Sequence, residues 1–276
     1  MNEIAKFKSI NFAENVIEQG GLRTKEIFKQ PSEGNPLITV ITTVLNGEKY
    51  LEESILSLHA QNYSNIEHII IDAGSNDGSL NIIKKYDDKI DYWCSKKDKG
   101  IYDGFNLGMK LAKGDYIGFL NSDDIYTKDA FDHLLKYIKN YPEKDFIFGS
   151  VKKHWGILHG YKPHKIYWSW GFYSSHSTGF FIKLGKAKQI GLYNLKYRYS
   201  ADYDYFFRMI VEHKLNGIGT KKNELFGIFR RGGFSSRTNF IDHFFEEIKI
   251  RLDNGQSKLL VLFIFIYKFL KHFRKF

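Results

Sequence analysis

Short apolar runs rich in β-branched residues alternate with segments of helical periodicity over residues 37–140, and this alternation constrains the fold most strongly. The first run, residues 37–44, reads Leu-Ile-Thr-Val-Ile-Thr-Thr-Val, which is typical of a buried parallel strand. Strand and helix in turn at this spacing predict a mostly parallel sheet flanked by helices and joined by right-handed crossovers. The expected fold class is therefore α/β.

The expected elements follow from the same periodicity, and residues 1–35 are mixed and polar, so we expect them to form an N-terminal extension. Strands are expected at residues 37–44, 66–71, 90–94 and 115–120, and helices at about 50–58, 80–86, 101–112, 128–140, 240–252 and 258–276.

Length and composition exclude several classes of protein. The chain has 276 residues, enough for a full hydrophobic core, and its single cysteine, Cys94, excludes an intramolecular disulfide framework. The net charge of +10 indicates an anionic partner: nucleic acid, a membrane surface or a phosphorylated small molecule. No nucleic-acid recognition motif is present, so nucleic acid is not an expected partner. Residues 1–19 lack the apolar core of a signal peptide, so we expect a cytoplasmic location.

Polar residues follow three of the predicted strands, at Asn46, Asp72 and Asp123. The carboxyl ends of parallel strands share an edge where ligands bind in open α/β sheets, so these residues are expected to converge. The neighbouring carboxylates Asp123 and Asp124 would repel unless a cation or donors neutralise them, and Mg²⁺ or Mn²⁺ prefers such oxygens. A helix N-cap is an equally good interpretation of this segment.

Three further acidic segments are candidates for ligand binding or catalysis. Asp72, followed by small residues, could accept hydrogen bonds from a base or ribose, or could belong to a glycine-rich turn. Residues 97–103 precede a helix whose free N–H groups suit phosphate, or form a solvated loop. Asp202 is expected at a helix N-terminus, where it could act as a general base or complement the helix dipole.

Two basic or histidine-containing segments are candidates for acceptor or phosphate binding. His176 stands in Ser-His-Ser-Thr-Gly, although a lone histidine is more often structural. Gly233, with Arg230 and Arg237, could form an anion-binding loop, and a basic surface turn is the alternative.

Five segments, in order along the chain, together resemble the family 2 inverting glycosyltransferases, and among them the bacterial enzymes that build surface polysaccharide or lipopolysaccharide. They are residues 39–47, 71–79, 98–106, 114–124 and 199–204. The resemblance implies a GT-A fold, with a nucleotide-binding half (36–125) and an acceptor half (126–240). It implies transfer of a sugar from a nucleotide-sugar donor, most often UDP-linked, to a glycan or lipid-linked acceptor. The chain lacks the Gln-x-x-Arg-Trp motif of processive synthases, so transfer of a single sugar is expected.

The resemblance also implies a role for each matching residue. Asn121 stands where the family often has aspartate, and Ala73 stands where it often has a second one. The implied roles are nucleotide or sugar binding by Thr43, Asn46, Glu48, Asp72, Asp98, Gly100, Asn121, Ser122 and Asp123, metal binding by Asp123 and Asp124 with Mg²⁺ or Mn²⁺, and base catalysis by Asp202. A non-catalytic homologue is one alternative. A nucleotidyltransferase is the other, but Asn46-Gly47-Glu48 replaces the basic glycine-rich loop that such an enzyme needs.

The last segment, residues 241–276, is expected to be a helical, basic tail. From residue 255 onward it carries five lysines and arginines and no acid, and residues 259–265 are apolar around the whole helix. This pattern is typical of a helix lying on the inner face of the cytoplasmic membrane. Docking on the protein core or on a second subunit explains it equally well.

Overall fold

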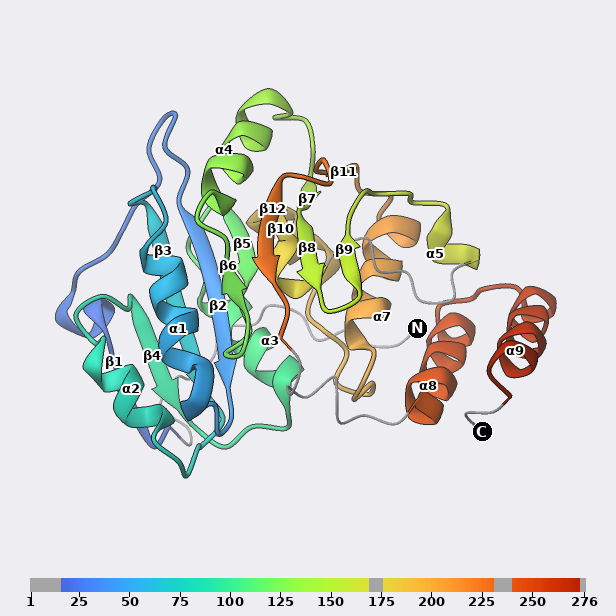
Figure 1. The fold of residues 1–276 in the computed structure, drawn as a ribbon, viewed down its shortest axis with the longest axis horizontal. Coiled ribbons are helices and arrows are strands. Elements are labelled where there is room, and N and C mark those ends of the chain that lie inside the picture. The colour runs from blue at the N-terminus through green and yellow to red at the C-terminus, as the bar shows by residue number, and fades with distance from the viewer. Residues whose placement is uncertain (1–15, 169–175, 231–239, 274–276) are drawn as a thin grey trace.

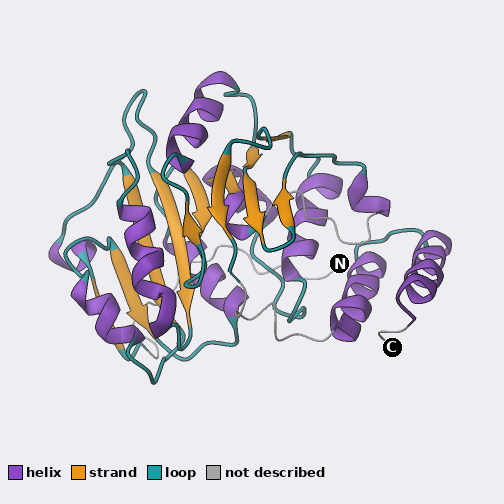
Figure 2. Cartoon of the chain, viewed as in Figure 1, coloured by secondary structure: helices purple, strands orange, loops and turns teal. Residues whose placement is uncertain are grey.

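A mixed sheet runs through the molecule, with helices packed against it (Figures 1 and 2). The computed structural model describes residues 16–168, 176–230 and 240–273. Within them the sheet has eight strands in the order β1-β4-β3-β2-β5-β10-β7-β11. In chain order these are β1 (Glu18–Gly20), β2 (Ile38–Val44), β3 (Ile66–Asp72), β4 (Tyr92–Ser95), β5 (Tyr116–Phe119), β7 (Phe146–Phe148), β10 (Phe180–Lys183) and β11 (Gly217–Gly219).

A smaller sheet and the helices complete the described chain. The small sheet has the order β6-β12-β8-β9 and consists of β6 (Ile125–Tyr126), β8 (Ser150–Lys153), β9 (Gly156–Leu158) and β12 (Leu225–Ile228). The α-helices are α1 (Glu48–His59), α2 (Ser79–Lys85), α3 (Ile101–Leu111), α4 (Ala130–Asn140), α5 (Lys165–Trp168), α6 (Leu184–Ile190), α7 (Ala201–Phe207), α8 (Phe240–Asp253) and α9 (Lys258–His272). Short helical turns are η1 (Leu22–Lys25), η2 (Ser177–Gly179) and the π-helical η3 (Arg208–Glu212).

The predicted α/β fold is confirmed, and all four predicted strands are present. The strands β4, β3, β2 and β5 are parallel neighbours and are buried along their whole length. Along β3, Ile70 packs with residues of α1 and α2, whereas Ile69 and Ile71 pack beside Leu107 of α3. The two faces of the sheet are therefore both covered, which explains the continuous β-branched runs in the sequence.

The sheet is mixed, because β10 enters it between β5 and β7 and pairs antiparallel with both. Its sequence, Phe-Phe-Ile-Lys, is short and lies in the half of the chain whose periodicity is irregular. Strands β7, β10 and β11 of the second half thus extend the same sheet, whereas β8, β9 and β12 pair in the small sheet.

Residues 16–35, the described part of the expected N-terminal extension, contribute strand β1 to this sheet. Strand β1 pairs antiparallel with β4, and Arg23 forms a buried ion pair with Glu67 of β3. The three residues of β1 are Glu-Gln-Gly, so they carry no apolar alternation that could reveal a strand. Backbone pairing and the buried charge pair hold this segment in place.

A second buried ion pair anchors the helical region after β10. Arg208 of η3 donates its Nε to Asp204 Oδ2 at 2.9 Å, and its two terminal nitrogens donate to the carbonyl oxygens of Ile190 and Leu192. Both charged side chains are almost fully buried. The pair therefore fixes α7 against the end of α6.

We expect Arg208→Leu to lower the free energy of unfolding by about 3–5 kcal/mol, because it leaves the Asp204 carboxylate buried without its cation. Denaturant unfolding followed by circular dichroism measures the change. Lys196→Leu, which removes the exposed partner of Asp253, serves as the control and should cost far less. An equal loss in the two variants would contradict this account.

Candidate active site

The loops that follow β2 and β3 meet at the carboxyl edge of the parallel strands. The register places Val44 opposite Asp72, so the two chains leave the sheet side by side. Asn46, which has a positive φ of 52°, accepts a hydrogen bond at Oδ1 from Asn76 N (2.9 Å). Glu48 Oε2 accepts one from Gly78 N (3.0 Å). Both predicted binding residues therefore join the two loops together.

Asp72 is fully buried and shapes the second of these loops. Its carboxylate accepts hydrogen bonds from Gly74 N and Ser75 N, each at 3.1 Å to Oδ2, and from Ser95 Oγ at 2.6 Å. The donor Ser95 ends the neighbouring strand β4. Asp72 thus lies at the edge where the sequence predicts it, and it orders the turn there.

Thr43 and Asp98 meet beside the start of α3. A methyl group placed on Gly104 would lie 2.8 Å from Thr43 Cγ2 and 3.3 Å from Asp98 Oδ2, so both side chains border the same helix turn. Asp98 Oδ1 accepts a hydrogen bond from Gly100 N (2.8 Å), and burial raises the pKa of Asp98. Thr43 Oγ1 is buried and has no hydrogen-bond partner, which leaves a donor and acceptor available to a ligand.

The acidic motif after β5 contains two carboxylates in different environments. Asp124 is fully buried and accepts hydrogen bonds from Asn121 Nδ2 (3.0 Å), Thr178 Oγ1 (2.9 Å) and Arg230 N (3.2 Å). Burial, followed by the charge of Asp123, raises the pKa of Asp124 to about 7. Asp124 therefore holds three segments of chain together with oxygens that are already occupied.

Asp123 is half-buried, and no other residue that the structure describes donates a hydrogen bond to it. Burial raises its pKa, and the charge of Arg230 opposes this effect. Beside it in the sequence, Asn121 Oδ1 is buried without a partner. A methyl group on Gly47 would lie 3.2 Å from Ser122 Oγ, so this motif also borders the first loop. Among the described residues, no three His, Cys, Asp or Glu side chains form a group that could hold a metal by itself.

Asp202 lies in the first turn of α7, as predicted. Its Oδ1 accepts hydrogen bonds from Tyr102 Oη (3.2 Å) and Tyr203 N (2.9 Å), whereas no described residue donates to its Oδ2. Burial raises the pKa of Asp202 to about 6. Because Tyr102 belongs to the first turn of α3, two residues after Gly100, Asp202 lies next to the segment that holds Asp98.

Lys153 connects the acidic motif with Asp202. Its Nζ lies 4.4 Å from the centre of the Phe229 ring, which contacts the His176 ring at 4.7 Å. His176 Nδ1 in turn lies 3.4 Å from Asp124 Oδ2. Burial lowers the pKa of Lys153, while the charges of Asp124 and Asp202 both oppose that shift. One ammonium group therefore interacts with both acidic centres.

His176 is half-buried, and burial together with the charge of Lys153 lowers its pKa to about 3. Of the basic loop predicted nearby, Arg230 is described and pairs with Glu53 of α1. Gly233 and Arg237 lie outside the described residues.

Comparison with known proteins identifies the family. The model of glycosyl transferase family 2 matches residues 39–207, more than half of the chain. The chain belongs to this family. An uncharacterized glycosyltransferase of Rickettsia typhi is 31% identical over 189 residues, which cover 64% of this chain and 59% of the relative. One of Mycobacterium tuberculosis is 28% identical over 225 residues, covering 72% and 83%. The chain thus spans less than two thirds of the Rickettsia typhi relative.

Solved structures show the same fold. S. aureus TarS (residues 1–349) in complex with UDP-GlcNAc superposes with a TM-score of 0.62 at 18% identity, covering 86% of this chain and 73% of TarS. The mannosyltransferase PcManGT of Pyrobaculum calidifontis, in complex with GDP-Man and Mn²⁺, gives a TM-score of 0.63 at 14% identity, covering 90% and 74%. This family 2 chain therefore has a GT-A-like α/β fold.

Two residues of the site, Tyr102 and Lys153, are absent from the sequence-based prediction. Tyr102 stands within the matching segment 98–106, so its place next to Asp98 is the signal that could have found it. Lys153 ends a four-residue strand, Ser-Val-Lys-Lys, whose composition carries no signal for a site. Only the folding of β8 beside η2 and β12 brings Lys153 to the acids.

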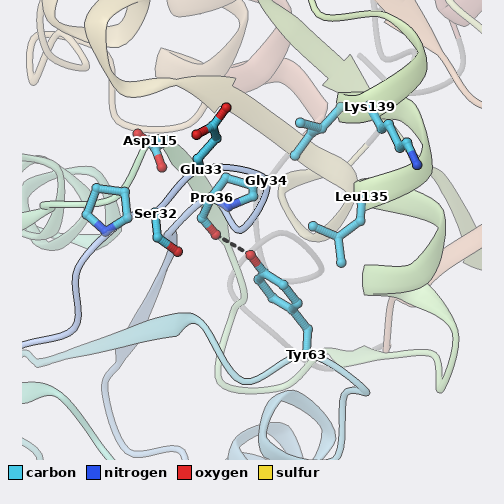
Figure 3. A pocket seen from close by; sticks show the side chains of 10 residues that line it. Ser32, Glu33, Gly34, Pro36, Tyr63, Asp115, Leu135 and Lys139 are labelled. Atoms are coloured by element: carbon cyan, nitrogen blue, oxygen red, sulfur yellow. Dashed lines mark hydrogen bonds between the residues drawn. The ribbon is translucent and has the colours of Figure 1, made fainter.

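A separate hollow lies at the opposite edge of the sheet, near the amino ends of β2, β3 and β5 (Figure 3). Pro36, Tyr63 and Asp115 line it, and the Tyr63 hydroxyl donates to the Pro36 carbonyl oxygen. None of the predicted site residues lines this hollow.

The Thr43 hydroxyl is buried without a hydrogen-bond partner among the described residues, and this predicts an unusual response to substitution. We expect Thr43→Val to leave the free energy of unfolding unchanged or to raise it by up to about 1 kcal/mol, because it removes a buried group without a partner. Thr42→Val is the matched control on the same strand. It breaks the 3.1 Å hydrogen bond between Thr42 Oγ1 and His68 Nε2 and should cost about 1–3 kcal/mol. Chemical denaturation distinguishes the two, and equal losses would contradict the assignment of Thr43 as a ligand-facing residue.

Proposed function

We propose that the protein is an inverting, metal-dependent glycosyltransferase that moves one sugar from a nucleotide-sugar donor to a hydroxyl of its acceptor. The observation that carries the proposal is Asp202: a half-buried carboxylate with a raised pKa, whose Oδ2 receives no hydrogen bond from a described residue and whose charge, like that of Asp124, acts on Lys153. The complexes of S. aureus TarS with UDP-GlcNAc and with UDP, and of PcManGT with GDP-Man, support a nucleotide-sugar donor. UDP is the first nucleotide to test.

The donor is proposed to lie over the carboxyl edge of β2 and β3. The proposed contacts of the nucleotide and its sugar lie at the start of α3. They are the Thr43 hydroxyl, which has no described hydrogen-bond partner, the Asp98 side chain and the backbone at Gly100. Asn46, Glu48 and Asp72 support this surface, since their side chains already bond to neighbouring backbone. Their proposed role is to hold the two loops in the shape that receives the donor.

The residues present fit a Mg²⁺ or Mn²⁺ ion that is completed by the donor. Asp123 offers a carboxylate free of other described donors, and Asn121 Oδ1 is a buried acceptor without a partner. These are hard oxygen ligands, and such ions share their remaining positions with phosphate oxygens and water. Asp123 would hold the ion, with Asn121 and Ser122 beside it. The occupied oxygens of Asp124 favour a supporting role for that residue. Bound there, the ion would stabilise the charge of the leaving diphosphate.

The chemical step is a single displacement. Asp202 Oδ2 accepts the proton of the acceptor hydroxyl while that oxygen forms a bond to the anomeric carbon. The bond from that carbon to the donor diphosphate breaks on the opposite face, so the configuration inverts and the electron pair leaves with the diphosphate. The ammonium of Lys153, which interacts electrostatically with both Asp124 and Asp202, would compensate the growing negative charge. Tyr102 holds the Asp202 carboxylate in position through Oδ1.

The proposed acceptor is a glycan or a lipid-linked saccharide, and the proposed process is the assembly of a bacterial surface polysaccharide or lipopolysaccharide in the cytoplasm. The resemblance of the five sequence segments supports this assignment. Within the described residues, no helix has the length and apolar character needed to cross a membrane.

The base assignment is tested with Asp202→Asn. We expect transfer of sugar from a UDP-sugar to fall by a factor of about 10² to 10⁴, because the proton acceptor is lost. The increase in melting temperature caused by UDP with Mn²⁺ should be the same in the variant and the parent, since ligand binding alone stabilises the fold. Asp123→Asn is the companion variant and should lose that increase. Transfer that is unchanged in Asp202→Asn removes this residue as the base and favours a non-catalytic nucleotide-sugar-binding homologue.

The pH profile gives an independent test. Transfer should rise with pH through a midpoint near 6, because Asp202 must be deprotonated to act as a base. In Tyr102→Phe the rise of kcat/KM with pH should occur at higher pH, because the hydrogen bond from Tyr102 lowers the pKa of Asp202 in the parent. The control is Tyr205→Phe, which removes a buried hydroxyl without a partner among the described residues and should leave the pH dependence of kcat/KM unchanged. An unchanged pH dependence in Tyr102→Phe would contradict the assignment of Asp202 as the base.

A further inference from the structure

Helix α9 buries one of its lysines, Lys268, and exposes many of its large apolar residues. Its inner face, at helical spacing, consists of Val261, Ile264 and Lys268, which are buried against α8. Lys268 forms an ion pair with Glu247 of α8. A helix on the surface of a water-soluble protein normally shows the reverse arrangement, so the outer face of α9 is suited to an apolar environment.

The outer face of α9 forms a continuous apolar surface, which we call the α9 face. Its residues and exposed fractions are Leu259 (80%), Leu262 (55%), Phe263 (60%), Ile266 (47%), Tyr267 (41%), Leu270 (68%) and Phe273 (64%). Phe245 and Leu252 of α8 are exposed as well. Scattered exposed apolar residues are common on protein surfaces, but a contiguous set of this size marks an interaction site.

Basic side chains flank this surface. Lys258 and Lys271 are exposed near the two ends of α9, and Lys249 stands between Phe245 and Leu252 at helical spacing on α8. The sequence from residue 254 to 276 contains no acid. Apolar residues bordered by lysine complement a bilayer surface with anionic headgroups, whereas a self-complementary protein interface would need acids to pair with these cations.

We propose that the α9 face docks on an anionic lipid bilayer, with α9 lying parallel to the surface. The leucine, isoleucine and phenylalanine side chains enter the boundary between headgroups and acyl chains, and the lysines contact lipid phosphates. Phe263, Tyr267 and Phe273 place aromatic rings at the interface, where such rings are favoured. Figure 1 shows α8 and α9 at one end of the molecule, away from α1 and α2.

Docking on this face would also orient the active site. Glu246 of α8 accepts hydrogen bonds at 2.6–2.7 Å from the backbone N–H groups of Arg198, Tyr199 and Ser200, which directly precede α7. The lipid-facing helix pair is thereby fixed to the segment that carries Asp202. This consequence rests on the proposed function and favours a lipid-linked acceptor, whereas docking itself does not depend on it.

The test is sedimentation of the full chain with sucrose-loaded vesicles of phosphatidylcholine alone or mixed with phosphatidylglycerol. We expect strong binding to the mixed vesicles, weak binding to phosphatidylcholine and weakening by salt. The double variant Leu262→Glu, Phe263→Glu should lower partitioning at least about tenfold. The control double variant Leu56→Glu, Tyr141→Glu replaces two apolar side chains that are also exposed elsewhere and should bind like the parent.

The charge contribution is tested separately. Lys258→Gln with Lys271→Gln should weaken binding to the mixed vesicles by about fivefold per charge and leave binding to phosphatidylcholine unchanged. Lys128→Gln with Lys139→Gln, two exposed lysines of the α4 region, is its control. The stabilisation by UDP and Mn²⁺ should be equal in all these variants, so a failure of docking remains distinct from a failure of the proposed function.

Three results would overturn the proposal. The first is that the parent chain does not sediment with mixed vesicles, and the second is that the α9 variants bind as well as their controls. The third is a dimer in light scattering that Leu262→Glu, Phe263→Glu converts to a monomer while the parent shows no lipid binding, which would assign the α9 face to a second copy of the chain.

Discussion

The parallel pairing of β2 with β3 is the constraint on which the site depends. The register runs unbroken from Ile38 opposite Ile66 to Val44 opposite Asp72, so both strands end at the same level of the sheet. A shift by one residue would turn every side chain of β2 to the other face and bury Thr43 against the wrong helix. The loops that carry Asn46 and Asp72 would then no longer bond to each other.

The same pairing explains why several acidic side chains lie together in a region that is shielded from water. Asp98, Asp123, Asp124 and Asp202 all have pKa values raised by burial, because the loops that carry them close over the end of a fully packed sheet. Burial of several like charges destabilises a fold unless donors or cations compensate them. Lys153 and the hydrogen bonds to Asp124 provide part of that compensation. A site of this kind favours ligands that bring positive charge or accept protons.

The sequence predicts the parallel core and the positions of its acids, because buried parallel strands are apolar throughout and their loops are polar. It does not predict β1, whose three residues are held by the backbone of β4, or the antiparallel entry of β10. Lys153 could not be predicted, since its place depends on the pairing of β8 with β12 across about 75 residues. The outward direction of the apolar face of α9 also required the structure, because the burial of Val261, Ile264 and Lys268 against α8 sets the rotation of that helix.

Three buried oxygens have no hydrogen-bond partner among the described residues, and two of them, Thr43 Oγ1 and Asn121 Oδ1, lie in the candidate site. Each of these two atoms has lost its hydration on burial, and this cost is not compensated until a ligand forms a hydrogen bond with it. A ligand that forms hydrogen bonds with these oxygens would stabilise the fold as well as occupy the site, so the ligand-bound protein should unfold more slowly than the protein alone.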